Sequence, residues 1–370
     1  MPTRDRDRAQ RAEPAGDSPD PGRTPTIHDV AARCGVAAST VSRAFSRPER
    51  VNPATRQRIL SIAAQMGYHP NPIARALPSG RTRTLGLLVP DITNPFFLDL
   101  IRGAERAAAT AGYTLVLADT EETSQQETTV VDRLTGAVDG FVLASSRLSD
   151  ARLREVYAKT RLVVVNRRVR PVPGVLIDSA TGTRQAAEHL ASLGHRRIAY
   201  LAGPRASWSD ARRWRTLQAV ARQRDLSVVR IGPLAPTVEA GVAAADAVVL
   251  NDVTAVVTFN DLLAIGVLRR LRARGVDVPG QVSVVGCDDI FGADFCHPPL
   301  TTLTAPIESA GRSAVDLLLS LFDGDEPGAP PRQDVVLPTR LTIRDSTAVA
   351  PTTGPDRSAQ DRAGPVSAAH

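Results

Sequence analysis

Residues 35–45 read GVAASTVSRAF and combine an apolar helix face with small, hydroxylated side chains and one arginine. Val41 and Phe45 are four residues apart, so a helix would place both on the same side. The opposite side would carry alanine and serine next to Arg43. An arginine can bind the O6 and N7 edge of guanine with two hydrogen bonds. Such a thin, hydrogen-bonding face suits close contact with another molecule; the alternative is an exposed helix without a partner.

Polar side chains also follow three apolar segments in the rest of the chain. They are Asp91 and Asn94 after LGLLV, Asn260 and Asp261 after AVVTF, and Asp288 and Asp289 after VSVVG. Ligands of open α/β sheets bind outside the carboxyl ends of the strands, so this placement suits a binding cleft. The alternative is that these carboxylates perform catalysis in an enzyme.

Three short helices would position the first set of residues. Thr26 and Asp29 resemble a capping box with aspartate in place of glutamate, and Gly35 ends the first helix. Asn52 and Pro53 begin the third helix as an N-cap followed by a proline. The tight glycine turn between the first two helices predicts a helix-turn-helix. Its expected core contains Ala31, Val36, Val41, Phe45 and Ile59.

Alternating strands and helices would position the second set, after the pattern changes near residues 79–84. Apolar runs occur at 85–89, 114–118, 140–144, 161–165, 197–201, 255–259 and 282–286. Helical segments such as 98–111 and 261–274 separate many of these runs. The alternation predicts parallel sheets that are covered on both faces. A stretch of roughly 260 residues is long for one such domain, so we expect two lobes.

The positive charge of the chain is concentrated near the N-terminus. The 370 residues carry a net charge of +6. Residues 24–84 contain nine arginines against Asp29 and Glu49, a net charge of +7, whereas residues 1–23 contain five arginines and five acids. The remaining residues therefore carry a net charge of −1. A small basic module of this kind is typical of a domain that neutralises phosphates, with an ordinary solvated basic face as the alternative.

Several classes of protein do not fit this sequence. No apolar stretch is long enough for a membrane span, and the N-terminus lacks the apolar core of a secretory signal. Cys34, Cys287 and Cys296 have neither metal-ligand nor disulfide spacing, so we expect a cytoplasmic protein without a metal or cofactor. The patterns GxxxxGK[ST] and GxSxG are missing, as is GxGxxG between a strand and a helix, which argues against the common enzyme classes.

Residues 25–84 resemble the DNA-binding headpiece of the LacI/GalR family of bacterial transcription regulators. The motifs that carry the resemblance are TIHDVA, GVAASTVSRA, VNPATRQRI and GYHPN, in order and at family spacing. The resemblance continues to about residue 345 through LGLLVPDITNPFF, LGHRRIAYLAGP, FNDLLAIGVLRRLRARGVDVP and VSVVGCDD. It implies a small all-α helix-turn-helix headpiece and a two-lobed α/β core with parallel sheets, similar to periplasmic binding proteins. The chain is then expected to cross between the lobes three times.

The resemblance also implies a set of DNA contacts in the headpiece. The residues are Ala38, Ser39, Arg43 and the hydroxyl-bearing Thr26, Thr40 and Ser42. Ala38 and Ser39 occupy the pair that helps to select the operator, and Arg43 would read a guanine. The hydroxyl groups suit phosphate oxygens, although surface or capping positions are the alternative for Thr40 and Ser42. Ala37 replaces a serine that is common in the family, which removes an N-cap worth roughly 1 kcal/mol.

A hinge helix is implied over residues 71–77, with DNA contacts from Asn71, Ala74 and Leu77. Leu77 would wedge into the minor groove at the operator centre, with Ala74 beside it. Pro78 departs from the family's usual residues and disfavours a helical conformation at Leu77. A plain linker with a surface leucine is the alternative.

For the effector cleft, the resemblance implies Phe97, Asp178, Ser209, Arg213, Asn260 and Asp288. Arg213, Asn260 and Asp288 match contacts to ligand hydroxyls, although a structural salt bridge between Arg213 and Asp288 is the alternative. Trp208 would either stack on a sugar ring or pack in the core. Residues 231–241 depart from the family's spacing, which leaves Leu234 and Pro236 as candidates for the lid position.

The expected organisation has disordered tails at 1–23 and 346–370, a helix-turn-helix domain at 24–70, a hinge helix and linker at 71–84, and an effector-binding and dimerisation domain at 85–345. The expected function is transcriptional repression through a pseudo-palindromic double-stranded DNA operator, by a homodimer located at the nucleoid. A small ligand between the lobes, expected to be a carbohydrate, would release repression, and corepression would use the same parts. A sugar-binding transport component is the alternative from another class, but it would need a secretory signal and no headpiece.

Overall fold

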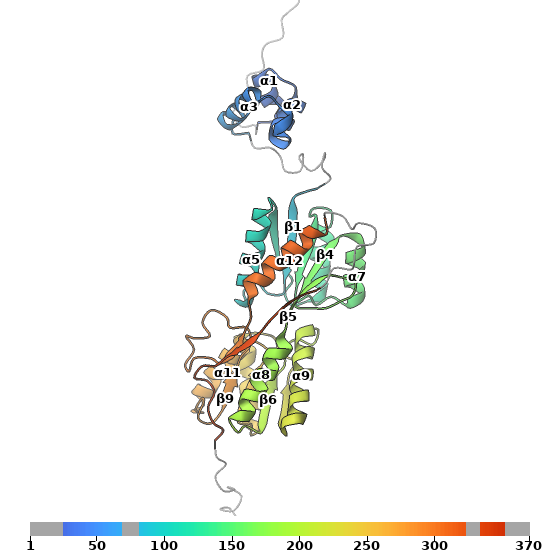
Figure 1. The fold of residues 1–370 in the computed structure, drawn as a ribbon. Helices are drawn as coiled ribbons and strands as arrows, with labels where there is room; N and C mark the ends of the chain where they lie inside the picture. The colour runs from blue at the N-terminus through green and yellow to red at the C-terminus, as the bar shows by residue number, and fades with distance from the viewer. Residues whose placement is uncertain (1–24, 69–80, 323–333, 352–370) are drawn as a thin grey trace, which may run out of the picture. The chain divides into compact units, whose positions relative to one another are not determined.

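The computed structural model describes residues 25–68, 81–322 and 334–351 and separates into two units, Met1–Thr82 and Arg83–His370 (Figure 1). Within the described parts of both units, no helix is long and apolar enough to cross a membrane. The same residues contain no group of three or more histidine, cysteine, aspartate or glutamate side chains that could hold a metal ion.

The headpiece, the described part of the first unit, is a small helical domain. It contains α1 (Ile27–Cys34), α2 (Ala38–Ser46), a short 3-10 helix (Pro48–Arg50) and α3 (Pro53–Gln65). The capping box is confirmed, since Thr26 Oγ1 accepts a hydrogen bond from Asp29 N and the Asp29 carboxylate accepts one from Thr26 N. Gly35 ends α1 with a φ of 63°, a conformation that favours glycine.

The three helices of the headpiece share one hydrophobic core. Its buried side chains are Val30, Ala31, Cys34, Val41, Ala44, Ile59 and Ala63. The prediction is therefore confirmed for Ala31, Val41 and Ile59, whereas Val36 and Phe45 are only partly buried. Phe45 packs edge-on against Tyr68, with the ring centroids 6.0 Å apart.

The N-lobe of the second unit is a six-stranded parallel sheet in the order β11-β5-β4-β3-β1-β2. Its strands are β1 (Thr84–Val89), β2 (Thr114–Asp119), β3 (Gly140–Ala144), β4 (Arg161–Val165), β5 (Gly174–Ile177) and β11 (Val335–Leu337). Its helices are α5 (Phe96–Thr110), α6 (Ser124–Leu134), α7 (Asp150–Lys159) and α12 (Ile307–Ser320). Alternate residues of β3 point to opposite faces: Val142 packs with α5 and α12, and Phe141 packs with α6 and α7. The sheet is therefore buried on both faces, as predicted.

Helices α5 and α12 lie side by side on one face of this sheet (Figure 1). Their close approach requires glycine at the contact, because a Cβ atom on Gly103 would lie 1.9 Å from the Glu308 carbonyl oxygen. A Cβ on Gly311 would lie 2.0 Å from the Leu100 carbonyl oxygen. The backbones of the two helices thus pack directly against each other, although α12 follows α5 by about 200 residues of sequence.

The C-lobe is a four-stranded parallel sheet in the order β7-β6-β8-β9. Its strands are β6 (Arg197–Leu201), β7 (Ser227–Ile231), β8 (Ala255–Thr258) and β9 (Ser283–Val285), and its helices are α8 (Ser179–Ser192), α9 (Trp208–Arg224), α10 (Val238–Leu250) and α11 (Asp261–Ala273). An antiparallel pair, β10 (Thr302–Thr304) and β12 (Arg340–Thr342), packs beside α8.

The chain crosses between the lobes three times. It passes from β5 to α8, returns from β10 to α12, and passes again from β11 to β12. This number of crossings agrees with the prediction, and it joins the lobes through three neighbouring segments (Figure 1).

The expectation of a disordered tail from residue 346 is wrong for residues 346–351. Ser346 is fully buried, and its hydroxyl donates to the Val284 carbonyl and accepts from Thr301 N. Its own carbonyl accepts from Val284 N, so the segment extends the pairing of β9. His195 Nε2 contacts the Ala348 carbonyl at 3.1 Å. Polar composition suggested a tail, but hydrogen bonds to the sheet edge order this segment.

Candidate functional site

The first turn of α2 is open at its N-terminus. Its N-cap residue is Ala37, which makes no side-chain cap, and the turn contains no acidic residue. The unsatisfied N–H groups of such a turn attract anions. Ser39 and Arg43 are exposed on this helix. The structure thus supplies a basic, hydrogen-bonding helix surface of the kind that enters a DNA groove.

The other predicted DNA contacts of the headpiece are half-buried or already form hydrogen bonds within the headpiece. Ala38, Thr40 and Ser42 are half-buried, and the Thr26 hydroxyl donates to the Asp29 carboxylate at 2.7 Å. Two arginines of the basic module also have structural roles. Arg56 donates to the Ala44 carbonyl and Arg58 to the Cys34 carbonyl.

The predicted hinge contacts Asn71, Ala74 and Leu77, together with Pro78, lie outside the described residues. Their roles on DNA stay predictions.

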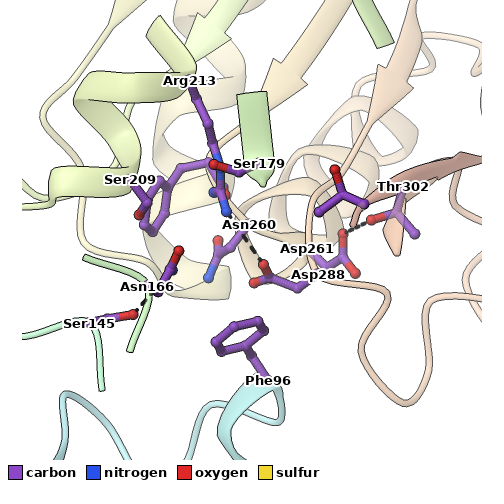
Figure 2. A network of polar contacts seen from close by, with 12 residues as sticks. Phe96, Ser145, Asn166, Ser179, Ser209, Arg213, Asn260, Asp261, Asp288 and Thr302 are labelled. Atoms are coloured by element: carbon purple, nitrogen blue, oxygen red, sulfur yellow. Dashed lines mark hydrogen bonds and ion pairs between the residues drawn. The ribbon is translucent and has the colours of Figure 1, made fainter. Parts of the chain in front are cut away.

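The cleft between the lobes has an inner chamber that brings together four of the six predicted effector residues. These are Phe97 from the N-lobe and Ser209, Arg213 and Asp288 from the C-lobe. Figure 2 shows the Arg213 side chain extending from α9 toward Asp288, with Phe96 approaching from the N-lobe. The Ser207 hydroxyl caps α9 by accepting from Asp210 N, which fixes the start of the helix that carries Ser209 and Arg213.

Arg213 and Asp288 form a loose ion pair in this chamber. Arg213 Nη2 lies 3.9 Å from Asp288 Oδ1, and both side chains are less than one-tenth exposed. Arg213 also donates to the Phe259 carbonyl, and its guanidinium lies 5.1 Å from the centroid of the Phe259 ring. Burial raises the pKa of Asp288 well above its ordinary range, although Arg213 opposes this effect. The oxygens of this carboxyl group can accept hydrogen bonds from ligand hydroxyls.

The backbone at Asp288 is strained. Its φ is 127°, in the region that favours glycine, and its N–H donates to the Leu303 carbonyl. The strain aims the carboxyl group into the chamber from the end of β9.

The N-lobe contributes polar residues that the sequence reasoning missed. Asn166 follows β4 and Ser145 follows β3, and both have a positive φ. Asn166 Nδ2 donates to Ser145 Oγ at 3.3 Å (Figure 2). Both lie at the carboxyl end of a predicted strand, so the rule that found Asp91 and Asp288 would also have found them.

Three buried polar atoms around this cleft have no hydrogen-bond partner among the described residues. They are Asn166 Oδ1, Ser179 Oγ and Arg213 Nε. Ser179 lines a neighbouring pocket that shares Phe96, Asn166, Arg213 and Asp288 with the inner chamber. Buried polar groups in proteins normally have partners, so a carbonyl-like acceptor, a hydroxyl and a guanidinium donor remain to be satisfied here. A ligand rich in hydroxyl groups can satisfy all three, because each hydroxyl both donates and accepts.

Two predicted effector residues are engaged elsewhere. Asn260 lies near Arg213 and Asp288 (Figure 2), but its Oδ1 accepts from Leu263 N and its Nδ2 donates to the Pro236 carbonyl. The Asp178 carboxylate accepts from Thr181 and Arg212 and lines neither of the pockets described above. Burial opposes ionisation of Asp178, but these hydrogen bonds outweigh it and lower its pKa. The Asn260 side chain thus caps the start of α11, and the Asp178 carboxylate binds side chains of α8 and α9.

An outer chamber of about 510 Å³ continues the cleft toward solvent. The N-lobe side presents Asp91, Asp119, Glu121 and Glu122, and the C-lobe side presents a proline-rich wall that includes Leu234 and Pro236. Both lid candidates therefore line the cleft. Trp208 lines neither chamber and is half-buried. The Arg212 guanidinium lies over the Trp208 ring, 5.6 Å from the ring centroid.

Comparison with known proteins agrees with this division into modules. Residues 26–71 match the family model described as bacterial regulatory proteins, lacI family, and residues 187–347 match a periplasmic binding protein-like domain. The HTH-type transcriptional repressor CytR of Escherichia coli (strain K12) is 35% identical over 336 residues, which cover 88% of this chain and 97% of that protein.

Two solved structures show the same architecture. A lac repressor dimer bound to operator and the anti-inducer ONPF matches 88% of this chain and 100% of its own, with a TM-score of 0.79 and 25% identity. A complex of the regulator CelR with cellobiose matches 87% of this chain and 99% of its own, with a TM-score of 0.64 and 31% identity.

Proposed function

The chain belongs to the lacI family of bacterial regulatory proteins, and we propose that it is a homodimeric repressor controlled by a carbohydrate ligand. It is a DNA-binding transcription regulator and not an enzyme. The proposed site of action is the nucleoid in the cytoplasm, at a pseudo-palindromic operator. Two-fold symmetry of such an operator would match that of the dimer.

The open first turn of α2 supports the proposed contact with DNA. Ser39 is exposed in this turn and Arg43 is exposed in the last turn of the same helix, and the first turn carries no negative charge that would repel phosphate. We assign base reading to Ala38, Ser39 and Arg43 and phosphate contacts to Thr26, Thr40 and Ser42. Asn71, Ala74 and Leu77 are proposed to bind the minor groove at the operator centre.

The unsatisfied atoms around the inner chamber carry the proposal of a hydroxylated ligand. Asn166 Oδ1 belongs to the N-lobe, and Arg213 Nε belongs to the C-lobe. One ligand that satisfies both atoms binds the two lobes together. It therefore favours one lobe arrangement over another, which is the requirement for a ligand to shift a conformational equilibrium.

The proposed coupling runs from the lobes to the DNA through the subunit pair. A change in the angle between the lobes would alter the distance between the two hinge segments of the dimer. Operator and effector would then each change the affinity of the other by the same factor. We propose release of repression by the ligand, and corepression would use the same coupling with the opposite sign.

Selection of bound duplexes from a random DNA library tests the proposal. The purified full chain is expected to enrich one pseudo-palindromic sequence, and one member of a panel of sugars and nucleosides is expected to change its affinity. Asp288→Ala should remove this ligand response while operator binding remains. Enrichment of no sequence under any condition, or a normal response in Asp288→Ala, would contradict the proposal.

A further inference from the structure

The walls of the cleft carry an excess of negative charge. The inner and outer chambers together are lined by the acids Asp91, Asp119, Glu121, Glu122 and Asp288 and by two arginines, Arg147 and Arg213. The described lining of the outer chamber contains no lysine, arginine or histidine. Even with a proton on Asp288, the acids outnumber the arginines by two to one.

Arg147 is not available as an anion-binding group. Its side chain is 4% exposed, and Nε and Nη2 each donate to Glu122 Oε2 at 2.7 Å. Its Nη1 donates to the Ser145 carbonyl at 2.8 Å. Glu122 therefore neutralises the N-lobe arginine at the point where the inner chamber meets the outer one.

The helix starts around the cleft are closed to anions as well. Six helices begin within a few residues of the chamber linings, namely α5, α6, α7, α9, α10 and α11. In each, a side chain accepts a hydrogen bond from a first-turn N–H group. The accepting residues are Asn94, Thr123, Ser149, Ser207, Thr237 and Asn260.

Each of these six helices also carries an acid in its first turn. The acids are Asp99, Glu127, Asp150, Asp210, Glu239 and Asp261. A carboxylate there offsets the positive end of the helix dipole, and the cap occupies a donor that would otherwise face an anion. Helix α8 differs: Asp178 stands at its N-cap position, but its first turn has neither a side-chain cap nor an acid. The usual anion-binding feature of α/β folds is thus suppressed at these six helix starts.

We propose that the effector of this protein is an uncharged hydroxylated molecule, and that the cleft rejects phosphorylated and carboxylated ligands. This inference rests on the proposed function, because it names the class of ligand for the same cleft. The ligand places hydroxyl groups against Asn166, Arg213 and Asp288, and the carboxylates of the outer chamber accept hydrogen bonds from its remaining hydroxyls. Glu122 is the residue that sets this selectivity, since it keeps Arg147 neutralised.

The test releases Arg147 and asks whether the cleft then binds an anion. Inorganic phosphate is titrated into the full chain, wild type and Glu122→Gln, at constant ionic strength, and the thermal unfolding of the core is followed by tryptophan fluorescence. We expect phosphate to bind the variant at least about tenfold more tightly than wild type. Binding of phosphate to the headpiece is common to both proteins and cancels in the comparison.

Asp252→Asn is the matched control. Asp252 is exposed and pairs with Arg197 at the other end of β6, so its loss frees an arginine outside the cleft. This control should bind phosphate as weakly as wild type. An equal affinity of wild type and Glu122→Gln for phosphate overturns the proposal. Saturable phosphate binding by wild type that Arg213→Gln removes also overturns it, because Arg213 would then act as an anion site.

Matched ligand pairs separate this inference from the proposed function. Ribose and ribose 5-phosphate, and glucose, glucose 6-phosphate and gluconate, are tested for binding and for an effect on operator affinity. Binding by a neutral sugar alone, with a change in operator affinity, supports both proposals. A phosphorylated sugar that binds and changes operator affinity overturns the inference but leaves the proposed function intact. A sugar that binds without any effect on operator affinity contradicts the proposed function.

Discussion

Helix α2 of the headpiece and helix α9 of the C-lobe begin in opposite ways. The N-cap of α2 is Ala37, without a capping side chain, and its first turn has no acid. The N-cap of α9 is Ser207, which accepts from Asp210 N, and Asp210 adds a carboxylate to the first turn. Two side chains thus decide whether a helix start attracts a phosphate or repels it. In the proposed function, the chain presents the open form to DNA and the closed form to its small ligand.

The largest effect on this difference is expected when the start of α2 receives a capping side chain and a negative charge. Ala37→Asp supplies both a cap and a negative charge, so operator affinity should fall by about a hundredfold or more while α2 itself becomes more stable. Fluorescence anisotropy measures the affinity, and hydrogen exchange of the α2 amides measures the helix stability. Ala37→Ser supplies the cap alone and should keep operator binding. Unchanged affinity in Ala37→Asp would show that this helix start does not face phosphate.

The burial of Asp261, the acid in the first turn of α11, should make the stability of the fold depend on pH. Burial raises the pKa of Asp261 from 3.8 to about 6, even though Thr302 and Ile290 donate hydrogen bonds to it (Figure 2). A raised pKa stabilises the fold below pH 3.8, and this contribution is lost as the pH rises through about 6. The shift corresponds to about 3 kcal/mol.

Urea unfolding of wild type and Asp261→Asn, followed by the fluorescence of Trp208 and Trp214 in the C-lobe, measures this loss. The stability of wild type relative to the variant should fall by about 3 kcal/mol between about pH 3 and pH 7. A difference that stays constant with pH would contradict the assignment, whatever the absolute stability of Asp261→Asn.

Base reading by α2 can be separated from general attraction to phosphate. Arg43→Ala should weaken operator binding by about 1–3 kcal/mol and flatten the preference at one base pair. Arg50→Ala removes another exposed arginine of the headpiece and should weaken binding equally on all sequences. Library selection with both variants measures the preferences. The same preference profile in wild type and Arg43→Ala would refute a base-reading role for Arg43.

The smallest effect is expected for removal of the Ser207 side chain, which caps the start of α9 beside the cleft. Ser207→Ala should lower the stability of the C-lobe by about 1 kcal/mol and leave operator affinity in the absence of ligand unchanged. Ser192→Ala is the control, because this exposed hydroxyl donates to the His189 carbonyl and caps no helix start. Urea unfolding measures both. Equal stability of Ser207→Ala and Ser192→Ala would mean that the α9 cap contributes nothing.

Most of the longer strands were predictable because their apolar residues are consecutive. Runs such as LGLLV and GFVLA coincide with β1 and β3, since a parallel strand buried on both faces needs no polar positions. The strands β5, β7, β10, β11 and β12 were not predicted. Val335 of β11 pairs with Val175, 160 residues earlier, and no local pattern reports such a contact. Residues 346–351 were misjudged for the same reason.

The site was predictable in position but not in the use of each residue. The rule that ligands bind at the carboxyl ends of strands correctly places Asp288 in the cleft, and it extends to Asn166 and Ser145. It cannot tell that the Asn260 side-chain amide forms hydrogen bonds with Leu263 N and the Pro236 carbonyl. Such local hydrogen bonds depend on loop conformation, which spacing in the sequence does not specify.

The three crossings between the lobes have a consequence for how such genes can recombine. A single breakpoint within codons 78–80 leaves all the proposed DNA contacts on one side and both lobes on the other. Exchange of one lobe for a foreign one would instead need three coordinated breakpoints, because its segments alternate along the chain. Operator preference can therefore be acquired whole from another gene, whereas a new ligand preference must accumulate by substitutions within an inherited cleft.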